Sequence, residues 1–191
     1  VTTLDVWALS GEDVTVPRQI ARVEPMAFGN CHALRRVRFE SPDVSIGHHA
    51  FHYAVNLSQV DLPEGLREIS APKVFSNCSS LQAIRFPASV RRLGAEMFAN
   101  CSELKSLNFS NFLTKEVQTM QKMFYNCFAM TSLDMSMHKT DSLTNMYRMF
   151  FNCRKLRLLD LKGFNVEQVE SIDDMFKGMK KLDVLDISNF N

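Results

Sequence analysis

Cysteine and histidine are the residue types whose spacing in this chain could support metal or redox chemistry. The five cysteines are Cys31, Cys78, Cys101, Cys127 and Cys153, and no Cys-x-x-Cys pair occurs. An odd count without close pairs argues against both a disulfide framework and a zinc site. Each cysteine instead stands three residues after a phenylalanine. We therefore expect buried, unpaired thiols in a recurring core position.

The nearest approach to a metal motif is the run His48-His49-Ala50-Phe51-His52. His48 and His52 would share one face of a helix, at a spacing that suits zinc or nickel. No Cys, Asp or Glu adjoins the run, so surface histidines are the favoured interpretation, and no metal or cofactor is expected. Signatures of nucleophilic hydrolases, phosphate-binding loops and zinc proteases do not occur in the sequence. The sequence therefore predicts no catalytic residue and no enzyme.

A recurring phenylalanine marks the elements that must position any functional residue. Seven copies follow one another at intervals of 23, 24, 23, 26, 26 and 26 residues: Phe28, Phe51, Phe75, Phe98, Phe124, Phe150 and Phe176. Five of them open the sequence Phe-x-Asn-Cys. A fixed period of this size is typical of a solenoid in which each repeat forms one coil. The asparagines are expected to satisfy backbone groups where the chain bends, and stacked copies would form a ladder.

An alternating apolar stretch follows each phenylalanine and completes a Leu-x-x-Leu-x-Leu pattern in most repeats. Eight short strands are expected, at residues 14–16, 37–39, 60–62, 84–86, 107–109, 133–135, 159–161 and 185–187. They must stack in parallel, because one full coil separates each strand from the next. Between them, Val117, Met120, Met123 and Phe124 fit one face of a short helix. The tighter repeats before them indicate turns or 3₁₀ pieces.

The fold class expected from this pattern is α/β. It is a right-handed leucine-rich-repeat solenoid with a parallel β-sheet of about eight short strands on one face and turns, 3₁₀-helices or short α-helices on the other. One solenoid would cover residues 1–191: a lead-in and first strand in 1–27, 23/24-residue repeats in 28–109 and 26-residue repeats in 110–191. The chain opens without an export signal and halts just after a strand. We therefore expect that any export signal has been removed or left out, and that the chain is a fragment of a longer array or has its terminal cap elsewhere.

Composition excludes some partner classes. The 22 basic and 21 acidic residues leave a net charge of +1, and this near neutrality gives no electrostatic case for binding nucleic acid, which requires a clustered basic face. No apolar run of about 18 residues occurs, so membrane insertion by this segment is not expected.

Two stretches carry a family resemblance. Residues 90–107 resemble the BspA-like leucine-rich repeats of bacterial and protist surface proteins, and residues 109–191 resemble the related 26-residue repeats of bacterial surface lipoproteins. Such proteins are often exported adhesins or host-binding proteins. The resemblance thus implies a cell-surface or secreted protein that binds a protein or a glycan. The alternative is a structural spacer that displays another domain of a longer chain.

The outward face of the strands is the candidate ligand-binding surface. Its residues are Arg36, Arg38, Gln59, Asp61, Arg85, Asn108, Asp134, Asp160 and Asp186. The arginines could form a basic patch at one end of this face. Three aspartates stacked one strand apart at the other end would repel one another, unless cations neutralise them. They predict either a polarised ligand face or weak calcium site, or aspartates that simply bond to local backbone as part of the repeat.

Overall fold

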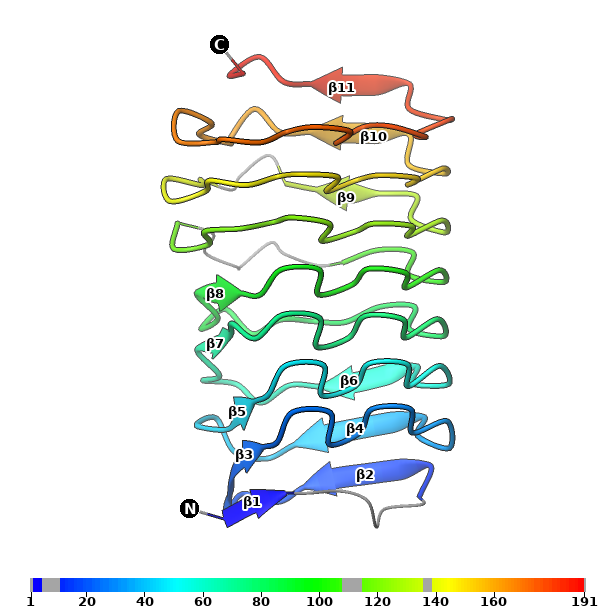
Figure 1. Ribbon diagram of the computed structural model, residues 1–191, viewed down its shortest axis with the longest axis vertical. Coiled ribbons are helices and arrows are strands. Elements are labelled where there is room, and N and C mark those ends of the chain that lie inside the picture. Colours follow the sequence, from blue (N-terminus) through cyan, green and yellow to red (C-terminus); the bar gives the residue numbers. More distant parts are fainter. Residues whose placement is uncertain (1, 5–10, 108–114, 136–138, 191) are drawn as a thin grey trace.

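The computed structural model of the chain describes residues 2–4, 11–107, 115–135 and 139–190. Its coils are stacked along one long axis, with the two termini at opposite ends (Figure 1). Each coil consists of a short strand, a bend and a return segment, by which we mean the stretch around one recurring phenylalanine. The parallel-strand solenoid expected from the repeats is therefore confirmed.

One ladder of parallel strands follows the predicted positions and is divided into two three-stranded sheets. The first sheet contains β2 (Asp13–Val16), β4 (Arg36–Phe39) and β6 (Gln59–Asp61), and the second contains β9 (Leu133–Asp134), β10 (Leu158–Asp160) and β11 (Val184–Asp186). Pairing is in register, with Val14 opposite Val37 and Val37 opposite Val60, and all three side chains are buried. Their neighbours point outward, as the two-residue period of a strand requires. The predicted strand at 84–86 is reduced to a single bridge position, and part of the one at 107–109 lies outside the described residues.

A second parallel ladder was not predicted. It is divided into a three-stranded sheet of β1 (Thr2–Leu4), β3 (Ile20–Val23) and β5 (Ser45–Ile46) and a two-stranded sheet of β7 (Glu68–Ile69) and β8 (Arg92–Leu93). In the 26-residue coils the same place is held by isolated bridges that join Thr119 to Asn145 and Asn145 to Ser171. Most of these strands have only two residues, which is too short for an alternating pattern to stand out in the sequence.

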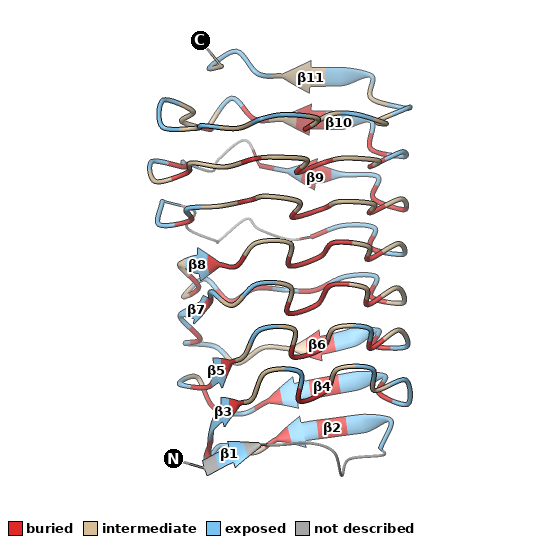
Figure 2. Ribbon diagram, viewed as in Figure 1, coloured by how far each residue is buried: buried red, intermediate tan, exposed pale blue. Residues whose placement is uncertain are grey.

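The seven phenylalanines form a single file inside the coils. Successive rings are stacked, with centroids 4.8, 5.4, 5.9, 6.2, 5.6 and 6.4 Å apart from Phe28 to Phe176. Six of the seven are fully buried, and the last is partly buried. Figure 2 shows buried residues recurring at the same places in successive coils. The interior is thus one continuous core along the axis, as expected for a solenoid.

The return segments contain no helix within the described residues, so the predicted α-helices and 3₁₀-helices are wrong. They are built from turns closed over three residues. For example, the N–H of Met123 donates to the carbonyl of Met120 at 3.1 Å, and the N–H of Cys127 donates to that of Phe124 at 3.1 Å. Turns of this length bring residues three apart to the same side, as a helix does. The spacing of the apolar residues therefore could not distinguish a helix from a series of three-residue turns.

Hydrogen bonds between coils replace the bonds that helices would have made. The N–H of Phe124 donates to the carbonyl of Met149 in the next coil at 2.9 Å, and the residues two before and two after it donate in the same way. The same three bonds join each of six successive pairs of coils, from Met26 to Asn152. This second set of inter-coil bonds satisfies backbone groups that would otherwise be unpaired near the core.

The residues two before and two after each phenylalanine adopt left-handed backbone conformations. These residues are Met26, Asn30, His49, Tyr53, Lys73, Asn77, Glu96, Asn100, Lys122, Asn126, Arg148, Asn152, Asp174 and Gly178. Asparagine and glycine tolerate this region better than other residues. The need for a left-handed conformation explains why five of the seven residues that stand two after a phenylalanine are asparagine. At Gly178, with φ of 80°, an added Cβ would also meet Asn152 Oδ1 at 2.2 Å.

The thiols of the Asn-Cys pairs have structural partners inside the coils. Cys78, Cys101, Cys127 and Cys153 are buried and unpaired, and each S–H donates to a phenylalanine carbonyl in the preceding coil at 3.1 to 3.3 Å. Burial raises the pKa of Cys101 and of Cys153 to about 12. Cys31 is only half-buried. The predicted core position for cysteine is confirmed for the four buried thiols.

No helix in the described part of the chain has the length and apolar character needed to cross a bilayer.

Candidate functional site

The exposed side chains of the first strand ladder form one surface, here called the strand face. At its N-terminal end, Arg36 lies opposite Gln59 and Arg38 lies opposite Asp61, all on β4 and β6. Arg36 Nε donates to Gln59 Oε1 at 3.1 Å, and Gln59 Nε2 donates to Asp61 Oδ1 at 2.9 Å. The strand register thus brings these four predicted residues together and holds three of them in one hydrogen-bonded row.

Arg85 lies farther along the strand face and has an acidic neighbour. Its Nη2 is 3.4 Å from Glu64 Oε1, and both side chains are largely exposed. A hollow of about 160 Å³ lies here, lined by Val60, Asp61, Leu62, Glu64, Arg85 and Pro87. The predicted arginine patch is therefore a surface of mixed charge, in which Asp61 and Glu64 accompany the three arginines.

Three of the predicted aspartates are stacked in register at the C-terminal end. Asp160 on β10 pairs with Asp134 on β9 and with Asp186 on β11. Asp160 Oδ1 accepts the backbone N–H of Lys162 at 3.0 Å, and Asp186 Oδ1 accepts that of Ser188 at 3.0 Å. The bond from Ser188 lowers the pKa of Asp186 below its ordinary value. These contacts agree with the structural interpretation, in which the carboxylates cap the bend that follows each strand.

Two apolar side chains interrupt the polar strand face. Leu158 and Val184 are opposite each other on β10 and β11, and they are 53% and 54% exposed. The strand alternation predicts both on the outward side, but the candidate set contains only polar and charged residues. Adjacent large apolar residues on an exposed face are typical of contact surfaces. Asn108, another predicted residue of this face, lies outside the described residues.

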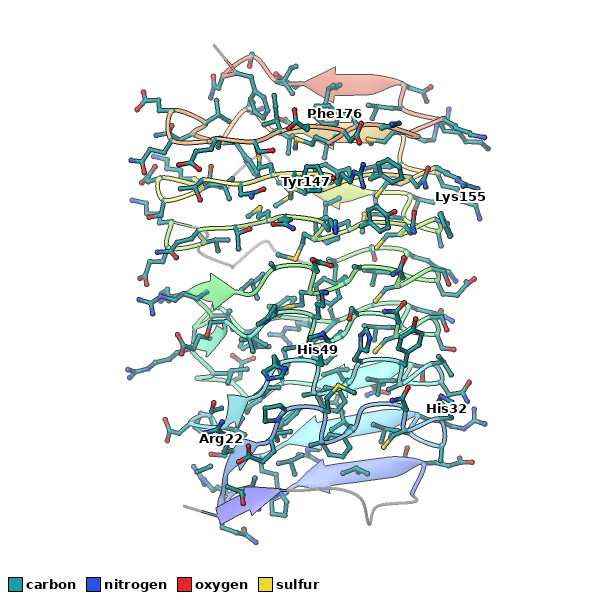
Figure 3. The ribbon with its side chains drawn as sticks, in the orientation of Figure 1. Arg22, His32, His49, Tyr147, Lys155 and Phe176 are labelled. Carbon is teal, nitrogen blue, oxygen red and sulfur yellow. The ribbon has the colours of Figure 1, made fainter. Side chains whose placement is uncertain are left out.

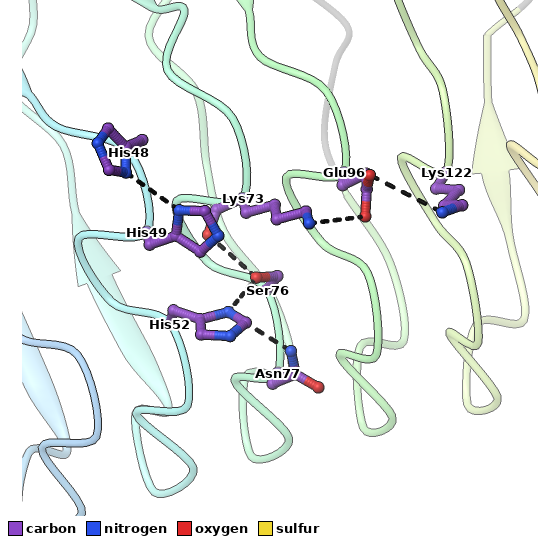
Figure 4. A network of polar contacts seen from close by, with 8 residues as sticks. All are labelled: His48, His49, His52, Lys73, Ser76, Asn77, Glu96 and Lys122. Carbon is purple, nitrogen blue, oxygen red and sulfur yellow. Dashed lines mark hydrogen bonds and ion pairs between the residues drawn. The ribbon is translucent and has the colours of Figure 1, made fainter. Parts of the chain in front are cut away.

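The histidine run lies in a return segment on another side of the coils (Figure 4). His48 Nδ1 is 3.2 Å from His49 Nδ1, and the rings of His49 and His52 are 4.9 Å apart. His52 Nδ1 lies 2.5 Å from Ser76 Oγ of the next coil. Burial is the main cause that lowers the pKa of His49 and of His52, and the charge of Lys73 lowers both further.

A row of charged residues continues from these histidines along the left-handed positions. Lys73 Nζ lies 3.7 Å from Glu96 Oε2, and Lys122 Nζ lies 3.9 Å from Glu96 Oε1. Among the described residues, no group of three His, Cys, Asp or Glu side chains is placed to hold a metal ion. The polar groups of this chain are thus arranged in extended rows on the outside of the coils, an arrangement suited to contact with a large partner.

Two protein-family models match this chain. Residues 7–118 match the model of the BspA type leucine rich repeat region, in six copies. Residues 93–191 match a family described as Mycoplasma protein of unknown function, DUF285. No curated protein matches the sequence.

Several solved structures have a similar fold. A leucine-rich repeat protein of T. pallidum is 26% identical with a TM-score of 0.60, and the match covers 81% of each chain. A leucine rich cell surface protein from Faecalibacterium prausnitzii is 26% identical with a TM-score of 0.57, over 65% of this chain and 33% of that one. A leucine-rich repeat protein from Eubacterium ventriosum is 21% identical with a TM-score of 0.72, over 93% and 46% of the two chains. This chain thus spans less than half of the last two proteins. The family match over more than half of its length shows that it belongs to the BspA-type leucine-rich repeat proteins.

Proposed function

We propose that this chain is a non-catalytic module that binds a protein or a glycan through the strand face. We further propose that it acts in a cell-surface or secreted protein, and that residues 1–191 form one solenoid unit. The similarity to a leucine rich cell surface protein from Faecalibacterium prausnitzii supports the location. The rigid, exposed side-chain rows of the strand face support the binding role.

The observation that carries the proposal is the exposed apolar pair Leu158 and Val184 at one end of a face whose other end is polar. Burying such a pair favours association by about 25 cal/mol for each Å² of apolar surface removed from water. At the other end, Arg36 and Gln59 are held in place by hydrogen bonds before any partner arrives. Side chains ordered in advance lower the entropic cost of binding.

A structural spacer is the second candidate function. It is favoured by the continuous file of rings from Phe28 to Phe176 and by the inter-coil hydrogen bonds of the return segments, which together make the stack stiff along its axis. A spacer would hold another domain at a fixed distance without using the strand face for recognition. The two functions predict different effects of mutations on this face.

The test is capture of cell-surface proteins and glycans from arrays, with this chain as bait. The variant R36E/R38E/R85E changes three exposed arginines, and L158S/V184S changes the apolar pair. If the strand face recognises the partner, both variants should lose capture of the same array features by about tenfold while their unfolding midpoints stay unchanged. Unchanged capture by both variants would contradict recognition through the strand face, and capture of no array feature by the wild-type chain would favour the spacer.

A further inference from the structure

The outward side of the return segments, here called the turn face, carries aromatic side chains in the 26-residue coils. Tyr125 and Phe151 occupy the same position of successive coils, directly after the buried phenylalanine. Their rings are stacked 5.0 Å apart at an interplanar angle of 15°, and both are half-buried. Because the two rings are stacked, they face each other, and the solvent-accessible part of the pair is a small apolar surface at the ring edges, here called the platform.

Cationic side chains surround this platform and hold it in place. The guanidinium of Arg148 lies 4.9 Å from the ring centroid of Tyr147 and 5.3 Å from that of Phe151. Its Nε and Nη2 atoms donate to Asp174 Oδ2 at 3.0 and 2.8 Å. Lys177 Nζ lies 5.9 Å from the ring centroid of Phe151. Cations over aromatic faces are attracted by the ring quadrupole, so this arrangement is stable without a ligand.

Four more cations lie at the adjacent bend, where the return segment leads into the strand. They are Arg154, Lys155, Lys180 and Lys181, and all four are exposed. Lys155 is labelled at the edge of the coils in Figure 3. The pair 180–181 follows 154–155 by one coil, so equivalent side chains start about 4.8 Å apart. Within the described part of the chain, no carboxylate lies within 4 Å of any of these four cations.

The positive charge is confined to these two coils. The equivalent residues of the first five coils are His32, Ala33, Val55, Asn56, Ser79, Ser80, Ser102, Glu103, Phe128 and Ala129, none of them lysine or arginine. Phe128 instead supports the cluster, because its ring centroid lies 4.7 Å from the guanidinium of Arg154. Like charges this close repel one another, and a polyanion laid across them would remove that cost.

We propose that this turn-face patch, formed by Tyr125, Phe151, Arg154, Lys155, Lys180 and Lys181, binds an acidic polysaccharide. The carboxylate or sulfate groups of the glycan pair with the four cations at the bend, and the C–H groups of a sugar ring pack against the exposed edges of Tyr125 and Phe151. The coil spacing is similar to the length of one sugar unit, so successive anionic sugars meet successive coils. A peptide chain matches the cations but has no regular row of ring C–H groups for the platform.

The experiment compares the binding of four polymers by biolayer interferometry: heparin, polygalacturonate, dextran and poly-glutamate. Heparin carries sulfates and polygalacturonate carries only carboxylates, so the stronger of the two identifies the preferred anionic group. The wild-type chain should bind at least one of them and should not bind neutral dextran. Poly-glutamate should bind about tenfold more weakly than the preferred glycan, since it lacks sugar rings. Poly-glutamate binding as tight as that of both glycans would overturn the proposal.

The variants separate this patch from the strand face. K155E/K180E/K181E and R36E/R38E/R85E change the net charge by the same amount on different surfaces. The first should weaken glycan binding about tenfold, and the second should change it less than about threefold. If K155E/K180E/K181E does not fold, K155Q/K180Q/K181Q is compared with R36Q/R38Q/R85Q, which changes the net charge by the same amount. Equal losses in the two triple variants would show a net-charge effect and overturn the proposal.

The platform has its own test, the variant F151S measured at raised ionic strength. Salt screens the lysines but leaves ring contacts intact, so this variant should lose a larger fraction of its glycan binding at high salt than at low salt. Binding equal to that of the wild type at both salt concentrations would contradict the stacking role. Because the strand-face residues are unchanged in these variants, failure here leaves the proposed function of that face to be judged separately.

Discussion

The side-chain amide of Asn152 donates to Oδ1 of Asn126 at 2.9 Å, one coil away along the return segments. Asn126 in turn donates to Asn100 Oδ1 at 2.8 Å. All three residues have left-handed backbone conformations, with φ between 58 and 63°. Asparagine therefore has two roles: it adopts the left-handed conformation at the bend of the coil, and its side chain bonds to the neighbouring coil. These two roles explain why asparagine recurs before cysteine.

The variant N126A tests this double role. Alanine loses both ladder bonds and fits the left-handed conformation poorly, so the free energy of unfolding should fall by about 2 kcal/mol. Glycine adopts the same conformation freely, and N126G should therefore lose less than N126A. Guanidinium denaturation of the three proteins gives the comparison. Equal losses in the two variants would show that the backbone conformation contributes little.

The file of rings should account for much of the stability. Phe150 is 0% exposed and stacks on both neighbouring rings of the file, so F150A should lower the free energy of unfolding by about 3–5 kcal/mol. Phe151, the next residue, is half-buried on the turn face, and F151A is the matched control with an expected loss of about 1 kcal/mol. A larger loss in F151A than in F150A would contradict the continuous core.

The thiols should differ in reactivity by position. Only the thiolate reacts, and burial raises the pKa of Cys101 and Cys153 to about 12, while Cys31 is half-buried. At pH 8, iodoacetamide should modify Cys31 first and should reach the other two only in denaturant. Mass spectrometry of peptides from native and unfolded protein measures this order. Modification of Cys101 at equal rates in both states would contradict its burial.

Acid should destabilise the coils that carry the histidines. The pKa values of His49 and His52 are lowered in the folded state, mainly by burial and then by nearby positive charge, while Glu96 partly opposes the effect at His49. The folded state therefore binds fewer protons than the unfolded state just below pH 6.5, the ordinary histidine value. The stability that comes from keeping His49 and His52 neutral is present above pH 6.5, and it is lost as the pH falls through the lowered pKa values of these two histidines.

The measurement is the denaturation midpoint at pH 7.5 and at pH 5.0, for the wild type and for H49Q/H52Q. The midpoint of the wild type should fall more between the two pH values than that of the variant. His48 and Lys73 remain in the variant, so they act as an internal control for the other charges nearby. An equal fall in both proteins would assign the acid sensitivity to other groups.

The repeat spacing was enough to predict what lies inside the coils. Once Phe28 to Phe176 are aligned, the strand positions and the burial of the cysteines follow from the two-residue alternation and the fixed period. The turns predicted for the return segments are present, but the predicted helices are wrong, because Met120, Met123 and Phe124 have the same spacing on a helix and on three-residue turns. Left-handed residues such as Lys122 distinguish the two structures, and nothing in a lysine side chain indicates that conformation.

The candidate surface was predicted in part. Strand alternation correctly placed Arg36, Arg38 and Gln59 on the outside, but it could not show that Glu64 lies beside Arg85, since that contact depends on the bend after β6. The candidate set was restricted to polar and charged residues, so it did not include the exposed pair Leu158 and Val184. The turn-face cations were missed because their cluster forms only when residues 26 apart are brought together by the coil.

Capture of partners by the strand-face variants is the most direct test of the proposed function. Array features other than acidic glycans that the wild-type chain binds should be lost in R36E/R38E/R85E and in L158S/V184S, and they should be retained in K155E/K180E/K181E. All variants must first show wild-type unfolding midpoints. Retention of every captured partner by both strand-face variants would contradict recognition through this face.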